Sequence, residues 1–222
     1  MVNLPFPDRS SAGRLLGAEL ASRKYAENAI VLALPRGGVP VAMEVAEALH
    51  APLDVIVVRK LGVPWQPELA MGAIARDTPV LDRALIRSLE IGDHEVESII
   101  ARETEELVRR EALYRRDLPQ HDLRGRTVII VDDGLATGST MLAAAHHARA
   151  VGAKKIIAAA PVGAPEACRR LKKELDDCVC LATPQQFYAV GQWYDDFRQV
   201  TDQEVHEMLQ RVQSRLEVPD SK

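Results

Sequence analysis

The chain has 222 residues, of which 47% are hydrophobic and only 4% aromatic, so its core should consist mainly of aliphatic side chains. Its formal net charge of −4 argues against a general binder of nucleic acid or of acidic membranes, because both need a basic surface. No apolar run approaches the ~18 residues of a membrane span, and no apolar leader is visible. We therefore expect a single cytoplasmic domain with a small cap.

Hydrophobic periodicity predicts that helices and buried strands alternate in the first quarter of the chain. A helix is expected from Arg9 to Tyr25, a strand from Ala29 to Leu34, a helix from Val41 to Leu49 and a strand from Leu53 to Val58. The next segment, Leu61 to Glu68, is rich in proline and glycine and is expected to be a loop.

The middle of the chain has a different pattern. Two short strands, Met71 to Ala75 and Pro79 to Asp82, precede a long helix from Asp93 to about Arg116. Glutamate–arginine pairs four residues apart stabilise this helix and are typical of a solvated face. The pairs are Glu105–Arg109, Glu106–Arg110 and Glu111–Arg115.

Strands and helices alternate again in the last part of the chain. Strands are expected at Thr127 to Val131, Lys155 to Val162 and Cys178 to Ala182, with helices after Thr140, from about Pro165 to Leu175 and from Thr201 to Leu216. Thr201 and Glu204 have the spacing of a capping box. The alternation predicts an α/β, doubly wound fold with a mostly parallel sheet covered on both faces.

The three cysteines, Cys168, Cys178 and Cys180, lie close together in the sequence. Their spacing contains no C-x-x-C and no histidine, so it gives little support to a zinc site. Cys178 and Cys180 alternate along a predicted strand, and we expect them to share one buried face. Unpaired thiols fit a reducing compartment.

Three loops of unusual composition follow predicted strands, namely Pro35–Gly38, Arg59–Leu61 and Asp132–Thr140. Ligands of parallel sheets bind outside the carboxyl ends of the strands, so these loops should converge at one edge. In the third loop, two acids suit a sugar diol or a metal ion. The glycine-containing turn that follows suits a phosphate, because it begins a helix. Taken alone, either half would be an ordinary turn or helix cap.

The whole segment Val131-Asp132-Asp133-Gly134-Leu135-Ala136-Thr137-Gly138-Ser139-Thr140-Met141 lacks the G-K-[ST] ending of an ATP-binding loop. It resembles the phosphoribosyl-pyrophosphate (PRPP) signature of type I phosphoribosyltransferases, and especially the version in adenine phosphoribosyltransferases. The resemblance implies that family's fold, with a small hood. It also implies that Asp132 and Asp133 hold the ribose hydroxyls. The 5-phosphate would be cradled by Ala136, Thr137, Gly138, Ser139 and Thr140.

Two earlier loops resemble other parts of the same family. Leu34-Pro35-Arg36-Gly37-Gly38 is similar to its pyrophosphate loop, and Arg59-Lys60 is similar to a pair that reaches the pyrophosphate. The segment from Leu61 to Ala75 would then be the family's mobile loop. The resemblance implies catalytic roles for Asp132, Asp133 and Arg36. It implies a pyrophosphate site that comprises Arg36, Gly37, Arg59 and Lys60.

A shorter resemblance lies near the C-terminus. Tyr188-Ala189-Val190-Gly191, followed by Asp195, is similar to the 6-oxopurine phosphoribosyltransferases. It implies that Tyr188 stacks on the acceptor and that Asp195, together with Asp133, serves a Mg²⁺ ion. The alternative is that Tyr188 and its aromatic neighbours form the core of a hood. Purine specificity is not implied, because Ala136 replaces an acid of those enzymes and Pro161–Pro165 lacks their lysine.

The sequence thus predicts a Mg-dependent phosphoribosyltransferase that transfers the phosphoribosyl group of PRPP to a nucleobase-like nitrogen acceptor and releases pyrophosphate. A non-catalytic PRPP-binding regulatory protein is the alternative, whereas a nucleic-acid-binding regulator is disfavoured by the acidic charge balance. The expected partners are PRPP and a small-molecule acceptor, without nucleic acid or membrane, and the family's usual arrangement implies a homodimer. Within one domain, 1–222, we expect a hood from about 1–25 and 183–222 and a helical and hairpin insertion from about 61–116.

Overall fold

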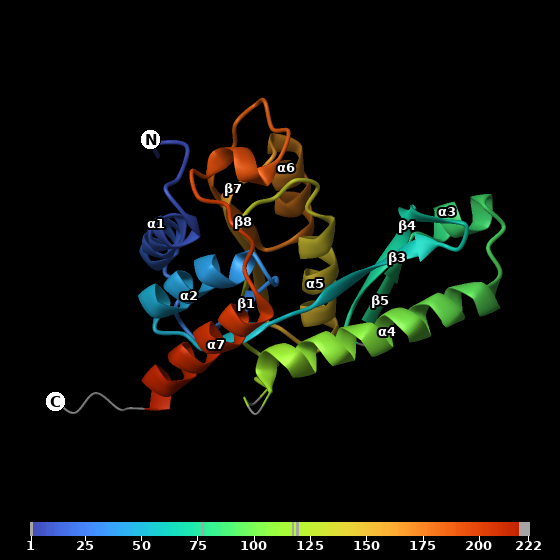
Figure 1. The fold of residues 1–222 in the computed structure, drawn as a ribbon, viewed down its shortest axis with the longest axis horizontal. Coiled ribbons are helices and arrows are strands. Elements are labelled where there is room, and N and C mark those ends of the chain that lie inside the picture. The colour runs from blue at the N-terminus through green and yellow to red at the C-terminus, as the bar shows by residue number, and fades with distance from the viewer. Residues whose placement is uncertain (1, 77, 117, 119, 218–222) are drawn as a thin grey trace.

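The computed structural model describes residues 2–76, 78–116, 118 and 120–217, which form two sheets surrounded by helices (Figure 1). The larger sheet is entirely parallel, with the strand order β2-β1-β6-β7-β8. Its strands are β1 (Ala29–Ala33), β2 (Leu53–Val55), β6 (Thr127–Val131), β7 (Lys155–Val162) and β8 (Asp177–Ala182). Neighbouring parallel strands such as β1 and β2, or β6 and β7, are joined through helices, as crossover connections require.

Helices cover both faces of this sheet, because alternate side chains of each strand point to opposite sides. The face that carries Val31 and Ile129 packs against α1 and α2, and the face that carries Ile30 and Ile130 packs against α5 and α6. These helices are α1 (Arg9–Ser22), α2 (Gly38–Leu49), α5 (Ser139–Ala150) and α6 (Pro165–Glu174). The predicted doubly wound α/β fold is therefore confirmed.

The second sheet is antiparallel and belongs to an arm (residues 58–76 and 78–115) that extends away from the large sheet (Figure 1). It consists of β3 (Val58–Val63), β4 (Gln66–Ala75) and β5 (Thr78–Leu81), followed by α3 (Arg83–Ser88) and α4 (Asp93–Arg115). The long α4 runs back along the arm and packs against α7 (Asp202–Glu217), which also contacts α2.

Two expectations for the start of the arm are wrong. The predicted strand from Leu53 to Val58 divides, because β2 ends at Val55 and β3 begins at Val58 in the other sheet. The predicted loop from Leu61 to Glu68 is instead the β3–β4 hairpin, with its turn after Val63. A Cβ on Gly62 would lie 2.4 Å from the carbonyl oxygen of Pro67, and the strand register shifts at the same point. Glycine there permits a bulge within a strand rather than a loop.

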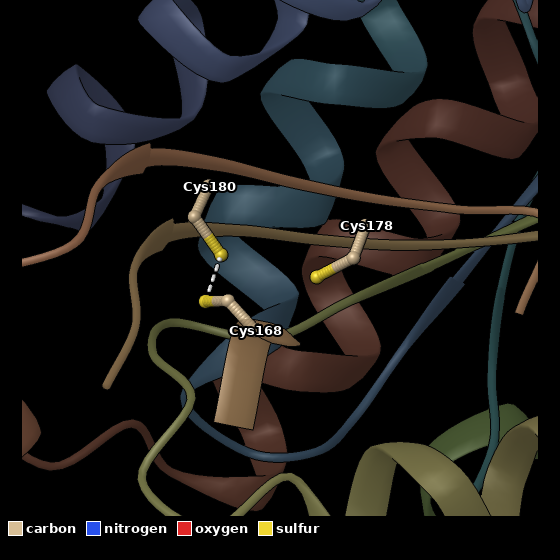
Figure 2. A group of neighbouring side chains, drawn as sticks. All are labelled: Cys168, Cys178 and Cys180. Atoms are coloured by element: carbon tan, nitrogen blue, oxygen red, sulfur yellow. Dashed lines mark hydrogen bonds between the residues drawn. The ribbon is translucent and has the colours of Figure 1, made fainter. Parts of the chain in front are cut away.

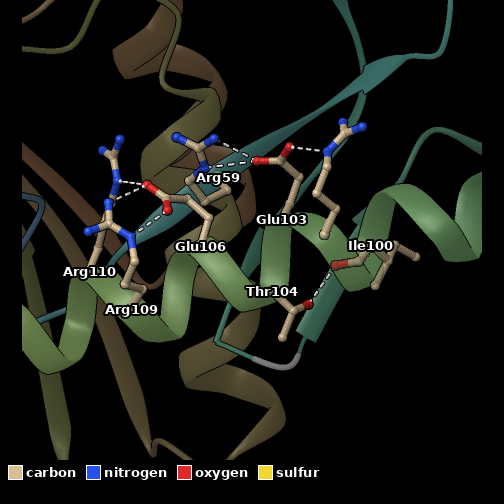
Figure 3. Close-up of polar contacts among 8 residues, drawn as sticks. Arg59, Ile100, Glu103, Thr104, Glu106, Arg109 and Arg110 are labelled. Carbon is tan, nitrogen blue, oxygen red and sulfur yellow. Dashed lines mark hydrogen bonds and ion pairs between the residues drawn. The ribbon is translucent and has the colours of Figure 1, made fainter.

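The other predicted helices and strands are present, with shifts of a few residues at their ends. The capping box of α7 is confirmed, because Thr201 N–H donates to Glu204 Oε2 at 2.8 Å and Glu204 N–H donates to Thr201 Oγ1 at 3.2 Å. On α4, the pairs Glu106–Arg110 and Glu111–Arg115 form at 2.7 Å and 2.9 Å. Arg109 pairs with Glu106 rather than with the expected Glu105 (Figure 3).

A buried ionic network joins the end of α4 to the edge of the large sheet. Arg115 donates to Asp54 Oδ1 and to the carbonyl oxygen of Val55, both at 2.7 Å, and to Glu111 Oε2 at 2.9 Å. Asp54 and Arg115 are 3% and 8% exposed, so each charge depends on its partners for stabilisation. The network therefore fixes where the arm leaves the sheet.

The segment before α1 lies beside the segment after β8. Phe6 N–H donates to the carbonyl oxygen of Trp193, and Asp195 N–H donates to that of Phe6, both at 2.8 Å. Phe6 and Tyr194 also form a small buried cluster with Val162. The extent of a hood at 1–25 and 183–222, and of an insertion at 61–116, stays a prediction. None of the helices in the described part of the chain is long and apolar enough to cross a membrane.

Candidate functional site

The loops after β1 and β6 meet directly, because the two strands are neighbours that end side by side. Leu34 N–H donates to the carbonyl oxygen of Val131 at 2.9 Å. A Cβ on Gly37 would lie 2.1 Å from Asp133 Oδ2, and a Cβ on Gly38 would lie 2.7 Å from the carbonyl oxygen of Val131. Glycines allow this approach, and the expected convergence of these two loops is confirmed.

Asp133 is a buried carboxylate with a partner from the far end of the chain. Its Oδ2 accepts a hydrogen bond from Arg9 Nε at 2.8 Å, and the side chain of Arg9 is only 10% exposed. Arg9 also donates to the carbonyl oxygen of Arg198 at 2.8 Å and lies 3.9 Å from the ring centroid of Phe197. The Tyr194 hydroxyl donates to the backbone oxygen of Asp133 at 2.6 Å. The α1 helix and the C-terminal segment thus hold this acid in place.

Asp132 is partly buried, and its Oδ1 accepts the N–H of Asp133 at 2.9 Å. Burial raises the pKa of Asp132 well above its usual range, and the nearby charge of Asp133 raises that pKa further. Burial also raises the pKa of Asp133, although Arg9 acts in the opposite direction. Two adjacent acids that are costly to ionise favour a ligand that donates hydroxyl hydrogens or brings positive charge.

The loop from Ala136 to Thr140 presents hydrogen-bond donors at the start of α5. Gly138 has a φ of +74°, and α5 begins at Ser139, so the first N–H groups of the helix lack partners within it. Thr137 Oγ1 accepts the N–H of Ser139 at 3.3 Å. The residues Ala136, Thr137, Ser139 and Thr140 are exposed. Donors at a helix N-terminus favour an anion such as a phosphate.

A cavity of about 880 Å³ separates this loop from the arm. Thr137, Ser139 and Thr140 line one side, and the other side includes Arg59, Lys60, His94 and Arg102. Arg59 and Lys60 therefore face the same space as the phosphate loop, although they come from the middle of β3 and not from the end of a large-sheet strand as predicted. The cavity is lined by several cationic side chains that suit a polyanion.

Arg59 is already paired within the arm. Its Nε and Nη2 donate to Glu103 Oε2 at 2.9 Å and 2.7 Å (Figure 3). Arg36 is half-exposed and lies 3.8 Å from Asp202 Oδ1 at the start of α7, and its peptide bond to Pro35 is cis. An exposed pair of this kind contributes little stability, so Arg36 can exchange Asp202 for another anion.

The predicted acceptor residue, Tyr188, and a predicted metal ligand, Asp195, lie on the segment between β8 and α7. Tyr188 is 85% exposed, so it does not belong to a hood core, whereas the Phe187 and Trp193 rings lie 6.3 Å apart. Asp195 is exposed. This segment lies against the acidic loop, because a Cβ on Gly134 would be 2.4 Å from a methyl carbon of Val190.

Sequence patterns did not indicate Arg9, which lies 124 residues before its partner Asp133. An arginine at the start of an amphipathic helix is ordinarily a surface residue, so only the tertiary fold identifies its role. The cavity residues of α4 were also missed, because the charges of that helix were interpreted as a solvated face. His94 and Arg102 have no local sequence signal for this position.

Comparisons with known proteins agree with this geometry. Residues 11–197 match the family model of the phosphoribosyl transferase domain. A Mycobacterium tuberculosis protein whose name gives a provisional assignment as a phosphoribosyl transferase is 48% identical over 208 residues, which are 93% of this chain and 47% of that protein. The chain thus spans about half the length of the curated relatives that it matches most extensively.

Two further relatives are informative. A uracil phosphoribosyltransferase of Bifidobacterium adolescentis is 32% identical over 142 residues, or 60% of this chain and 66% of that protein. The solved structure of the protein TT1426 from Thermus thermophilus is 42% identical and has a TM-score of 0.83, covering 94% of this chain and 99% of that one. With its fold, its loops and this match over most of its length, the chain belongs to the type I phosphoribosyltransferase family.

Proposed function

We propose that this protein is a Mg²⁺-dependent phosphoribosyltransferase that transfers the phosphoribosyl group of PRPP to a nitrogen acceptor and releases pyrophosphate. One observation carries the proposal: the acids of the β6 loop and the donors of the Ala136–Thr140 loop follow one another around the end of one strand. The first group suits ribose hydroxyls and the second suits a 5-phosphate. Family membership supports the reaction class.

The cations near the two loops suit the leaving group. When pyrophosphate leaves C1 of the ribose, negative charge grows on its oxygens and positive charge grows on the sugar ring. Arg36, Arg59 and Lys60 would stabilise the pyrophosphate, and the N–H of Gly37 would add a donor. Arg59 must first exchange Glu103 for the substrate. The ionised acids of the β6 loop would stabilise the positive ring through its hydroxyl groups.

The residues present also fit a magnesium ion, since the acids supply the hard oxygen donors that Mg²⁺ prefers. Arg9 pairs with Oδ2 of Asp133, so coordination would fall to the other oxygen of Asp133 and to Asp195. A bound Mg²⁺ neutralises part of the pyrophosphate charge. The arm would exclude water from the other side of the cavity, which protects PRPP from hydrolysis.

Pyrophosphate release from PRPP across a panel of nucleobases and small amines tests this proposal. We expect Mg-dependent release with at least one acceptor, and loss of that release in Asp132→Asn. PRPP binding without release for any acceptor would favour the alternative, a regulatory protein that only senses PRPP. The pairing of Arg59 with Glu103 is the observation that keeps this alternative open.

We further propose a homodimer, the family's usual arrangement, which light scattering of the purified chain would test. The free thiols of Cys168, Cys178 and Cys180 support a reducing compartment such as the cytoplasm. The acceptor would be a small nitrogen compound, and Tyr188 is the candidate for stacking on it.

A further inference from the structure

The three cysteines of the chain converge between α6 and β8 (Figure 2). Cys178 and Cys180 share one face of β8, as expected, and Cys168 reaches them from α6. All three Sγ atoms lie within 4.8 Å of one another, and those of Cys168 and Cys180 are 2.9 Å apart. The motif spacing gave little support to a metal site, because this cluster is formed by tertiary packing.

The surroundings of the sulfurs differ from an ordinary apolar contact. A Cβ on Gly163 would lie 2.6 Å from Cys168 Sγ and 3.1 Å from Cys180 Sγ, so the backbone leaves the sulfurs room. The three thiols therefore lie close enough together to contact a single ion.

We propose that Cys168, Cys178 and Cys180 form a three-thiolate binding site for a soft d¹⁰ metal ion, Zn²⁺ or Cu⁺. Thiolates select these ions over the hard cations that carboxylates prefer. With metal–sulfur distances of about 2.3 Å, three ligands around one ion lie about 4 Å apart. Cys168 and Cys180 must therefore separate by about 1 Å, which side-chain rotation supplies. Cys180 is only partly buried and gives the ion a route inward.

The metal site would be structural, because it lies behind the Ala136–Thr140 loop and not within that loop. Gly163 pairs with Leu135, and a Cβ on Gly138 would lie 3.2 Å from Leu171 of α6. A bound ion would tie α6 to β8 and support the floor of that loop. Binding should release thiol protons and raise the thermal midpoint of unfolding.

Titration of the reduced, full-length chain with Cd²⁺ under anaerobic conditions tests the site, because thiolate-to-cadmium charge transfer gives an ultraviolet band. Thiols are counted first, and three should be free. We expect one Cd²⁺ per chain and protection of all three thiols from alkylation. Parallel competition titrations with Zn²⁺ against a chromophoric chelator and with Cu⁺ against bicinchoninate distinguish the two ions, and tight binding of either supports the proposal.

Single variants Cys168→Ser and Cys180→Ser should each weaken Cd²⁺ binding by at least about tenfold, and the triple serine variant should lose the band. His146→Ala is the control, since it removes an exposed ligand-type side chain on α5 outside the cluster and should leave the titration unchanged. The alkylation measurement needs no variant, so it holds even if a variant fails to fold. A missing band in the wild-type chain, unprotected thiols, or a Cys168–Cys180 disulfide that excludes metal would overturn the proposal.

Discussion

Arg9 stabilises the buried negative charge of Asp133 by forming an ion pair with it. Replacing Arg9 by methionine keeps most of the side-chain volume but leaves a buried carboxylate without its partner. We expect Arg9→Met to lower the free energy of unfolding by about 3 kcal/mol. Urea denaturation at neutral pH measures this loss.

Arg14 provides the matched control, because it lies on the same helix in an exposed pair with Glu44. Arg14→Met should change the free energy of unfolding by no more than about 0.5 kcal/mol. Equal effects of the two substitutions would show that the contact between Arg9 and Asp133 is not important for stability.

We expect the side chain of Asp132 to serve PRPP binding but to lower the stability of the folded protein at neutral pH. Burial raises the pKa of Asp132 above its ordinary value of 3.8, so the folded state holds this proton more tightly than the unfolded state. The group's stabilising contribution is complete below pH 3.8 and is lost as the pH rises through the folded-state pKa. Asp132→Asn should therefore stabilise the protein at neutral pH, by on the order of 1 kcal/mol.

The stabilisation by Asp132→Asn should shrink as the pH falls and vanish well below the ordinary carboxyl pKa of 3.8, because the wild-type side chain is then neutral in both states. Thermal unfolding across a pH series compares the two proteins. A difference that stays constant with pH would contradict the assigned cause.

The residues of the two site loops could be predicted from sequence, whereas their supports could not. Asp132, Thr137 and Gly138 belong to one continuous segment whose order of acids, glycine and hydroxyls is itself informative. Arg9 contacts that segment across 124 positions, and the sequence around it resembles an ordinary surface helix. Its role depends on how α1 packs, which local patterns do not determine.

At the scale of an element, the turn into α5 depends on Gly138, whose φ is +74°. A side chain there is strained and would also lie 3.2 Å from Leu171. We expect Gly138→Ala to cost about 1 kcal/mol in stability and to lower PRPP affinity about tenfold, because the loop's N–H groups move.

Gly125 is the matched control for this turn. Its φ is +69°, and a Cβ there would meet no atom within 4 Å. Gly125→Ala should have a similar backbone cost with PRPP affinity unchanged in calorimetry. Equal losses of affinity in both variants would mean that the Gly138 effect comes from general destabilisation.

The β3–β4 hairpin shows where element prediction reached its limit. Proline and glycine between Leu61 and Glu68 are typical of loops, but here Gly62 accommodates a bulge against Pro67. A loop and a bulge within a strand can both require a residue without a Cβ, so glycine occurs in both. Only the partner strand distinguishes them, and the partner is a property of the tertiary fold.

At the scale of the whole molecule, the arm is held by the network around Arg115. Its guanidinium joins α4 to β2, so its loss would leave Asp54 buried without its closest partner. We expect Arg115→Met to lower the free energy of unfolding by about 3 to 5 kcal/mol. Hydrogen exchange should show the largest increase in the amides of α4 and the arm.

Arg109 on the same helix provides the comparison, because its pair with Glu106 is exposed. Arg109→Met should leave stability within about 1 kcal/mol of wild type and leave exchange in the arm unchanged. Uniform loss of protection across the large sheet in Arg115→Met would instead indicate that the arm and sheet unfold as one unit.

The alternation of strands and helices predicted the parallel sheet, because each crossover helix requires it. The separation of the chain into two sheets at residues 56–57 was not visible, since Leu53 to Val58 reads as one strand-like run. That run is divided because its first part, β2, pairs with β1 in the large sheet, whereas its continuation, β3, pairs with β4 in the arm. The position of the cavity follows from this division, so it too emerged only from the structure.

Calorimetric titration of PRPP with Mg²⁺ into the purified chain tests the central claim most directly. The wild-type protein should bind one PRPP per chain, and the double variant Asp132→Asn with Asp133→Asn should show no measurable binding. Thermal unfolding and circular dichroism confirm that the variant is folded. Unchanged affinity in a folded double variant would contradict the assignment of the PRPP site to the loop after β6.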